Sequence, residues 1–82
     1  MRDKYYRTTN LNMATFLFAK DQIIVGVNPI NDSQKEFAFV LTPELEELSE
    51  IYKFGDSNDE RRYIEIRKYE QARNSLLDLL KN

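Results

Sequence analysis

A strand pattern passes directly into a helix start in the stretch Phe37-Ala38-Phe39-Val40-Leu41-Thr42-Pro43-Glu44. Its first part is apolar and aromatic, as in a buried β-strand. Thr42 then supplies a hydroxyl that can cap a helix, Pro43 suits the first helical position, and Glu44 complements the positive end of the helix dipole. The stretch predicts a strand over 37–41 and a helix over 43–54, which Gly55 ends in the left-handed conformation.

A second strand is expected upstream, over residues 22–27, where β-branched residues are frequent. Residues 28–33 between the two strands are dense in turn formers, so the strands should form an antiparallel hairpin. Gly26 lies inside the first of these strands. A glycine in that place indicates a β-bulge or the close approach of another backbone.

Two more helices complete the expected fold. Thr8, Thr9 and Asn10 can cap a helix over 10–20, whose apolar residues recur at spacings of three and four. A last helix is expected over 59–80 from an apolar stripe of Ile66, Tyr69, Ala72, Leu76, Leu77 and Leu80. We predict a single α+β domain over residues 1–82, ordered helix, hairpin, helix, helix. The hairpin, with or without an additional strand over residues 3–8, packs on the three helices.

Several classes of site chemistry lack their usual residues in this chain, which has no histidine, no cysteine and two glycines. Histidine and cysteine supply many proton shuttles, nucleophiles and metal ligands. The glutamates of the 43–54 helix are spread round it, which disfavours a metal site or a pair of catalytic carboxylates; they are Glu44, Glu46, Glu47 and Glu50. The sequence therefore predicts a protein that is not an enzyme and that holds no metal or cofactor.

The N-terminal arm is the first candidate binding surface, because it combines cations with aromatic rings: Arg2, Lys4, Tyr5, Tyr6 and Arg7. Proteins that bind single-stranded nucleic acid use this mixture for phosphate attraction and base stacking. Alternatively, the arm is an edge strand whose cations guard an exposed sheet edge. Both interpretations are kept.

Arg73 is the second candidate, because a helical wheel places it in the middle of the apolar arc of the last helix. Arg62 lies on nearly the same meridian, but so close to the start of the predicted helix that solvation alone could account for it. Arg73 could extend along its aliphatic stem to solvent or pair with a glutamate of the 43–54 helix. Alternatively, both arginines belong to a binding surface that recognises carboxylate or phosphate.

The chain also resembles a family of small domains of unknown function found in phage, mobile elements and little-cultured bacterial lineages. The resemblance rests on Tyr6-Arg7-Thr8-Thr9-Asn10-Leu11, Ala14-Thr15-Phe16-Leu17, Phe37-Ala38-Phe39 and Thr42-Pro43-Glu44-Leu45-Glu46-Glu47-Leu48. A glycine often ends the first helix of that family, whereas this chain has Lys20-Asp21. The resemblance implies a compact α+β domain and a role in nucleic-acid processes, and it carries over no site residue.

The function expected from the sequence is a non-enzymatic binding or adaptor module that acts through a protein partner. A net charge of −2 favours a protein over nucleic acid, since phosphate contacts need clustered cations. The alternative is a nucleic-acid-binding accessory or regulatory protein that uses the basic arm and the last helix. We expect a homodimer, because a small domain without disulfides or metals gains stability by burying a further face. The charged N-terminus and the lack of a long apolar stretch predict a cytoplasmic protein without a membrane span.

Overall fold

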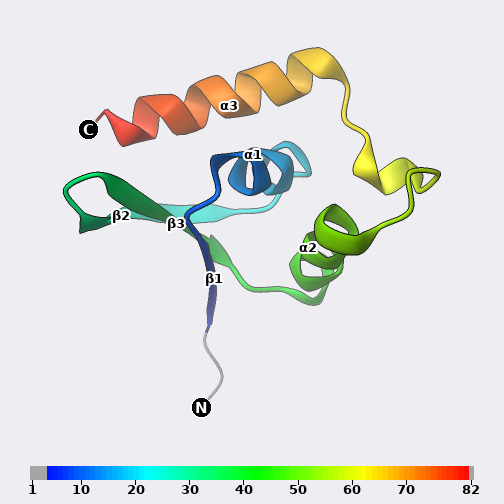
Figure 1. The fold of residues 1–82 in the computed structure, drawn as a ribbon, viewed down its shortest axis with the longest axis horizontal. Coiled ribbons are helices and arrows are strands. Elements are labelled where there is room, and N and C mark those ends of the chain that lie inside the picture. The colour runs from blue at the N-terminus through cyan, green and yellow to red at the C-terminus, as the bar shows by residue number, and fades with distance from the viewer. Residues whose placement is uncertain (1–3, 82) are drawn as a thin grey trace.

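A computed structural model describes residues 4–81 and has three helices and a three-stranded antiparallel sheet, so the predicted α+β class is confirmed (Figure 1). The elements, in chain order, are β1 (Tyr5–Thr8), α1 (Leu11–Ala19), β2 (Ile24–Asn31), β3 (Gln34–Val40), α2 (Pro43–Phe54), the 3₁₀ turn η1 (Glu60–Arg62) and α3 (Ile66–Leu80). We call residues 63–65, between η1 and α3, the linker. None of the helices described is long and apolar enough to cross a membrane.

The sheet has the strand order β1-β3-β2, so β3 lies in the centre. Phe39 of β3 pairs with Tyr6 on β1 and with Ile24 on β2. Phe37 and Phe39 are buried, and Tyr6 and Ile24 pack against the same core. The N-terminal arm is therefore an edge strand over Tyr5–Thr8, as one of the two interpretations predicted.

The hairpin turn is shorter than predicted. β2 continues through Pro29 to Asn31, and the chain reverses at Asp32 and Ser33. The Asn31 Oδ1 atom accepts a hydrogen bond from the Ser33 N–H at 3.0 Å, which stabilises the reversal. Proline is tolerated in β2 because this strand lies at the edge of the sheet.

Gly26 marks a β-bulge, as one of its two interpretations predicted. Ile24 pairs with Phe39 and Gly26 with Ala38, so Val25 is an extra residue on β2. The other interpretation, a close approach of a second backbone, has no counterpart within residues 4–81. A Cβ atom built on Gly26 meets no atom of the described residues within 4 Å beyond its chain neighbours.

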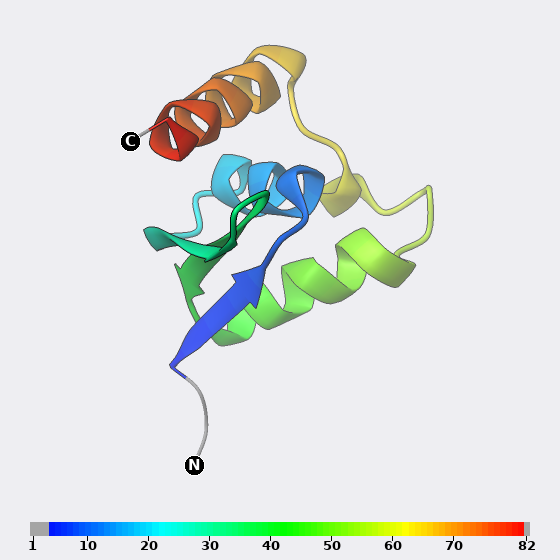
Figure 2. The ribbon, with the colours of Figure 1, turned by 60° about the vertical axis from the view of Figure 1, so that its left-hand side comes forward.

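The helices cover the face of the sheet that bears Phe37 and Phe39. In both ribbon views α1 lies between the sheet and α3, with α2 beside α1 (Figures 1 and 2). The buried core consists of Met13, Ala14, Phe16 and Leu17 from α1, Phe37 and Phe39 from β3, Leu45 and Leu48 from α2, and Leu76 from α3. Each large apolar side chain buried in this way contributes roughly 1.5–3 kcal/mol. Because α1 contributes the most residues, it is the centre of the fold.

The last helix begins later than predicted, at Ile66 and not at 59. Asp59 caps only the short turn η1, and the backbone is extended at Tyr63. The Glu65 side chain then accepts hydrogen bonds from the N–H groups of Arg67 and Lys68 and starts α3. The two caps therefore start two separate elements, η1 and α3, where one long helix was predicted. Ile66, predicted to lie in the apolar stripe, is 70% exposed.

The left-handed residue predicted at Gly55 occurs at the end of a different helix. Gly55 has φ −66° and ψ 150°, which is extended backbone. Asp21 has φ 67° and follows the end of α1. There the Gln22 N–H bonds to the Leu17 carbonyl and the Asp21 N–H to the Phe18 carbonyl, each at 3.1 Å. This is the Schellman arrangement, with aspartate in the place that glycine usually takes.

Candidate binding cleft

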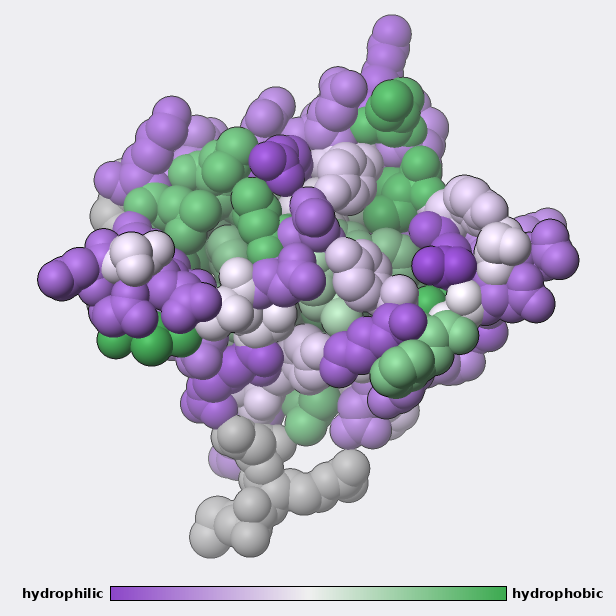
Figure 3. All heavy atoms as spheres, viewed as in Figure 1, coloured by the Kyte–Doolittle hydropathy of each residue, from purple (hydrophilic) through white to green (hydrophobic). Residues whose placement is uncertain are grey.

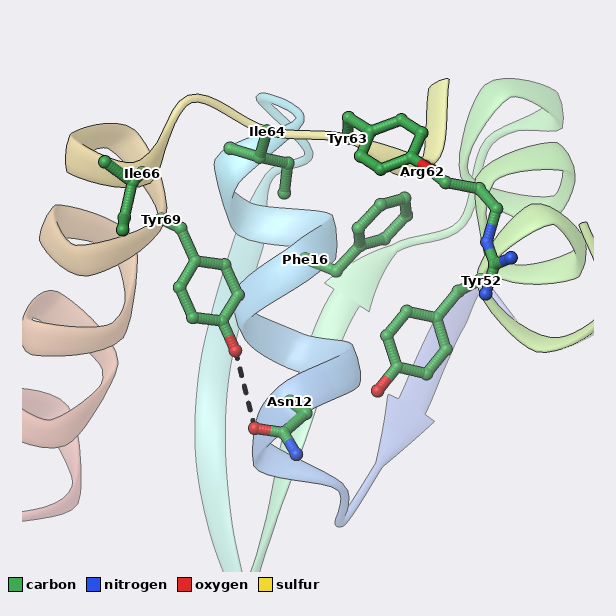
Figure 4. Close-up of a pocket in the computed structure, with 8 residues that line it drawn as sticks. All are labelled: Asn12, Phe16, Tyr52, Arg62, Tyr63, Ile64, Ile66 and Tyr69. Carbon is green, nitrogen blue, oxygen red and sulfur yellow. Dashed lines mark hydrogen bonds between the residues drawn. The ribbon is translucent and has the colours of Figure 1, made fainter. Parts of the chain in front are cut away.

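An open cleft of about 730 Å³ lies between the three helices and the linker. Its walls are formed by Asn12, Phe16, Tyr52, Arg62, Tyr63, Ile64, Ile66 and Tyr69 (Figure 4). We call it the aromatic cleft, because half of these residues carry aromatic rings. Its volume is within the range of small-ligand sites.

The cleft runs along one side of α1, between the end of α2 and the start of α3 (Figure 4). Asn10 caps α1 through hydrogen bonds from the N–H groups of Asn12 and Met13, at 2.9 and 3.1 Å. This cap places Asn12 in the first turn of α1, with Phe16 one turn later on the same side. Tyr52 lies in the last turn of α2, and the first turn of α3 supplies the remaining helical wall.

The aromatic rings differ in how far they reach solvent. Phe16 forms the floor, since it is only 4% exposed, and its ring lies 5.4 Å from that of Tyr52 at a tilt of 53°. Tyr69 is half-buried, and its hydroxyl donates to the Asn12 Oδ1 atom at 3.4 Å (Figure 4). Tyr63 is 63% exposed. The cleft therefore has a buried aromatic floor and a more exposed aromatic rim.

The linker wall is tied to the rest of the molecule by hydrogen bonds. The Lys20 ammonium, at the end of α1, donates to the Tyr63 carbonyl at 2.8 Å. The Tyr63 hydroxyl donates to the carbonyl of Ser57. These bonds hold the linker across the end of α1, where it closes one side of the aromatic cleft.

Arg61 connects η1 to α2. Its guanidinium donates to Glu47 on α2 and to both carboxylate oxygens of Asp59. The hydrogen bond from the Arg61 side chain, followed by that from its backbone N–H, lowers the pKa of Asp59 below its ordinary value of 3.8. The pKa of Arg61 is raised, first by Asp59 and then by Glu47. Arg61 therefore joins two elements through its side chain.

Arg62 is the one charged residue among the described residues that line the aromatic cleft. Figure 4 shows its side chain extending from η1 toward the Tyr52 side of the cleft. Within residues 4–81 its guanidinium makes no hydrogen bond or ion pair. An arginine in such a place offers a planar set of donors to an incoming anion.

A second hollow, of about 410 Å³, adjoins the first. Tyr52 lines both, so the two hollows adjoin at this residue. Tyr6, Arg7 and Lys53 also line the second hollow. Arg7 makes an ion pair with Glu36, with 3.5 Å between Nε and Oε1.

The residues predicted for binding do not all lie together. Arg62 lies in the aromatic cleft, and Tyr6 and Arg7 lie in the second hollow. Lys4 and Tyr5 are exposed at the start of the chain described, and Arg2 lies outside the described residues.

Arg73 lies apart from the other predicted residues, since α3 and β1 are on opposite sides of α1 (Figures 1 and 2). It is half-buried. The predicted ion pair with a glutamate of α2 is absent from the described part of the chain. Arg73 lines neither hollow, and its partial burial fits an aliphatic stem packed on the helix surface.

Most of the cleft was missed by sequence analysis, namely Asn12, Phe16, Tyr52, Tyr63 and Tyr69. Tyr52 and Tyr69 fit the apolar stripes of their helices, and Tyr63 was placed inside a continuous helix. A usable signal was the number of tyrosines on both sides of the polar stretch 55–60, because tyrosine combines apolar area with a polar end.

Comparisons with family models, with curated proteins and with solved structures gave no match for this chain.

Proposed function

We propose that this protein is a non-enzymatic binding module that recognises a protein partner, and that the aromatic cleft receives a segment of that partner. One observation carries the proposal: four aromatic residues and one arginine, from separate elements, meet around a single open cleft. Tyrosine and arginine are among the residues that contribute most to protein–protein affinity. The partly exposed rings offer apolar contact area, and their hydroxyls can bind the backbone of a partner.

A protein partner is favoured over nucleic acid by the charge of the molecule. The net charge is −2, and the glutamates of α2 give the neighbouring helix an acidic surface. Nucleic acid would be repelled by such a surface unless many cations were gathered elsewhere. The nucleic-acid alternative is supported by a narrower observation, which is that Tyr6 and Arg7 of the basic arm line the second hollow beside Tyr52.

The experiment that tests the proposal selects short peptides from a randomised display library on the immobilised protein. Binding of the selected peptides is then measured by fluorescence polarisation for the wild type, Tyr63→Ala and Phe54→Ala. Tyr63 and Phe54 are both highly exposed, at 63% and 78%, but only Tyr63 lines the cleft. Loss of an aromatic contact of this kind should weaken binding at least about tenfold for Tyr63→Ala, while Phe54→Ala binds like the wild type.

Two results would contradict the proposal. One is a selection that yields no peptide with saturable binding. The other is a set of peptides whose affinity is unchanged in Tyr63→Ala and reduced in Phe54→Ala, which would place the partner outside the aromatic cleft.

A further inference from the structure

The aromatic cleft and the second hollow adjoin at Tyr52, which lines both, and we call the two together the groove. Helix α1 contributes Asn12 and Phe16 to the first, and Met13 with the N-cap residue Asn10 to the second. A ligand that occupies both hollows must span Tyr52. Such a ligand is extended rather than compact, like a peptide segment without secondary structure of its own.

The charge of this groove is opposite in sign to that of the whole molecule. Its described lining residues include the cations Arg62, Lys53 and Arg7 and the single acid Glu36. Glu36 is already paired with Arg7. Within residues 4–81, neither the Lys53 ammonium nor the Arg62 guanidinium makes a hydrogen bond or an ion pair. Two cations are thus available to a ligand on a protein whose net charge is −2.

We infer that the segment bound in this groove is an extended acidic peptide of the protein partner, an inference that rests on the proposed function. Apolar side chains of the peptide enter the aromatic cleft over Phe16. Its carboxylates meet Arg62 at one side of Tyr52 and Lys53 at the other. A guanidinium binds a carboxylate through two parallel hydrogen bonds, so Arg62 fixes the position of the peptide as well as attracting it.

The rings and cations fit a peptide better than single-stranded nucleic acid. Base stacking needs successive ring faces that are open to solvent. Phe16 is 4% exposed and Tyr52 and Tyr69 are half-buried, which leaves Tyr63 as the exposed ring of the cleft. Side chains of a peptide can enter between rings that are partly covered. Two unpaired cations also neutralise few phosphates.

The test uses three synthetic peptide pools that share the same randomised apolar positions. The remaining positions hold Asp and Glu in the acidic pool, Asn and Gln in the neutral pool, and Lys and Arg in the basic pool. Labelled oligothymidylate is the fourth probe. Each is titrated against the wild type, Arg62→Glu, Lys53→Glu and Arg67→Glu. Arg67 is a matched control, since it is exposed on α3 and lines neither hollow.

The inference predicts that the acidic pool binds most tightly and that added salt weakens its binding. Arg62→Glu and Lys53→Glu should each reduce its affinity about tenfold or more, and Arg67→Glu should change it by less than about twofold. Equal binding of the acidic and neutral pools, unaffected by Arg62→Glu, overturns the inference and leaves the proposed function standing. If oligothymidylate binds more tightly than every pool and its binding depends on Arg62, the inference and the proposed function are both overturned in favour of nucleic acid. Binding of none of the four probes also overturns both.

Discussion

Of the two glycines, Gly55 is the one at which the surrounding atoms leave no room for a side chain. A Cβ atom there would lie 2.5 Å from the carbonyl oxygen of Ile51 and 3.2 Å from Cδ of Arg62. The position therefore requires glycine because of a close approach, although its φ is negative. The same contact places the stem of Arg62 directly against the end of α2.

Replacement of the two glycines by alanine should therefore have opposite effects. Gly55→Ala must displace the Ile51 carbonyl and should lower the free energy of unfolding by about 1–3 kcal/mol. Gly26→Ala meets open space and should raise the free energy of unfolding by up to about 1 kcal/mol, since it restricts the unfolded chain. Urea denaturation of both variants measures the difference. Equal effects of the two substitutions would contradict the close approach at Gly55.

Individual residues were predicted from sequence where the signal is local. The Thr42 hydroxyl accepts from the Leu45 N–H at 3.0 Å and Pro43 begins α2, as the sequence indicated. The left-handed residue was assigned to Gly55 because glycine adopts that conformation most easily. Asp21 adopts it instead, since the chain must turn sharply from α1 into β2. Tertiary packing, rather than residue type, decides which residue adopts the left-handed conformation.

At the scale of elements, the linker depends on η1, which Arg61 joins to α2. Asp59 caps this turn and also accepts from the Arg61 side chain. Both interactions are stronger with the ionised carboxylate than with the neutral carboxyl group, which is why the pKa of Asp59 is lowered. Loss of the carboxylate charge should loosen η1 and with it the linker wall of the cleft.

The lowered pKa of Asp59 predicts a pH dependence of stability. Ionised Asp59 stabilises the folded state above its ordinary pKa near 3.8, and this contribution is lost as the pH falls through the lower folded pKa. Asp59→Asn should therefore have a lower melting temperature than the wild type at about pH 5, and the difference should shrink by about pH 2. Thermal melts by circular dichroism measure it. Asp32→Asn, at the exposed hairpin turn, is the control, and its melting temperature should follow that of the wild type. A difference in melting temperature between Asp59→Asn and the wild type that stays constant across this pH range would contradict the prediction.

Elements with strong local patterns were predicted well, whereas the ends of the hairpin strands and of the last helix were not. α2 has the predicted bounds, because a cap, a proline and an apolar stripe agree. The break between η1 and α3 was missed because residues 59–65 are polar enough for an exposed helix surface. What distinguishes them is the set of contacts from Lys20 and Glu47, which come from distant parts of the chain.

The whole molecule is flat, with extents of 38, 36 and 19 Å. Apolar side chains reach its visible face in separate patches among hydrophilic ones (Figure 3). The cleft could not be predicted from sequence, because its lining residues are spread along the chain from Asn12 to Tyr69. The lining residues on the helices also follow the same spacing as ordinary core residues. The α+β class was predictable, because hydrophobic periodicity changes clearly between the hairpin and the helices.

The homodimer remains a prediction at this scale. Ile23, Val25 and Ile30 lie along or beside the edge strand β2 and are 65%, 51% and 50% exposed. A second copy that pairs with this edge would bury them. Light scattering at high micromolar concentration should give a dimer for the wild type and a monomer for Val25→Lys. A wild-type monomer under these conditions would remove the prediction.

The proposed function places the bound partner in the aromatic cleft. The most direct measurement is a titration of the isotope-labelled protein with the tightest selected peptide, followed by amide chemical shifts in NMR spectra. The largest shifts should fall on Tyr52, Tyr63 and Ile64, with little change at Val25 and Ile30 on β2. Largest shifts along β2, with an undisturbed linker, would contradict the account.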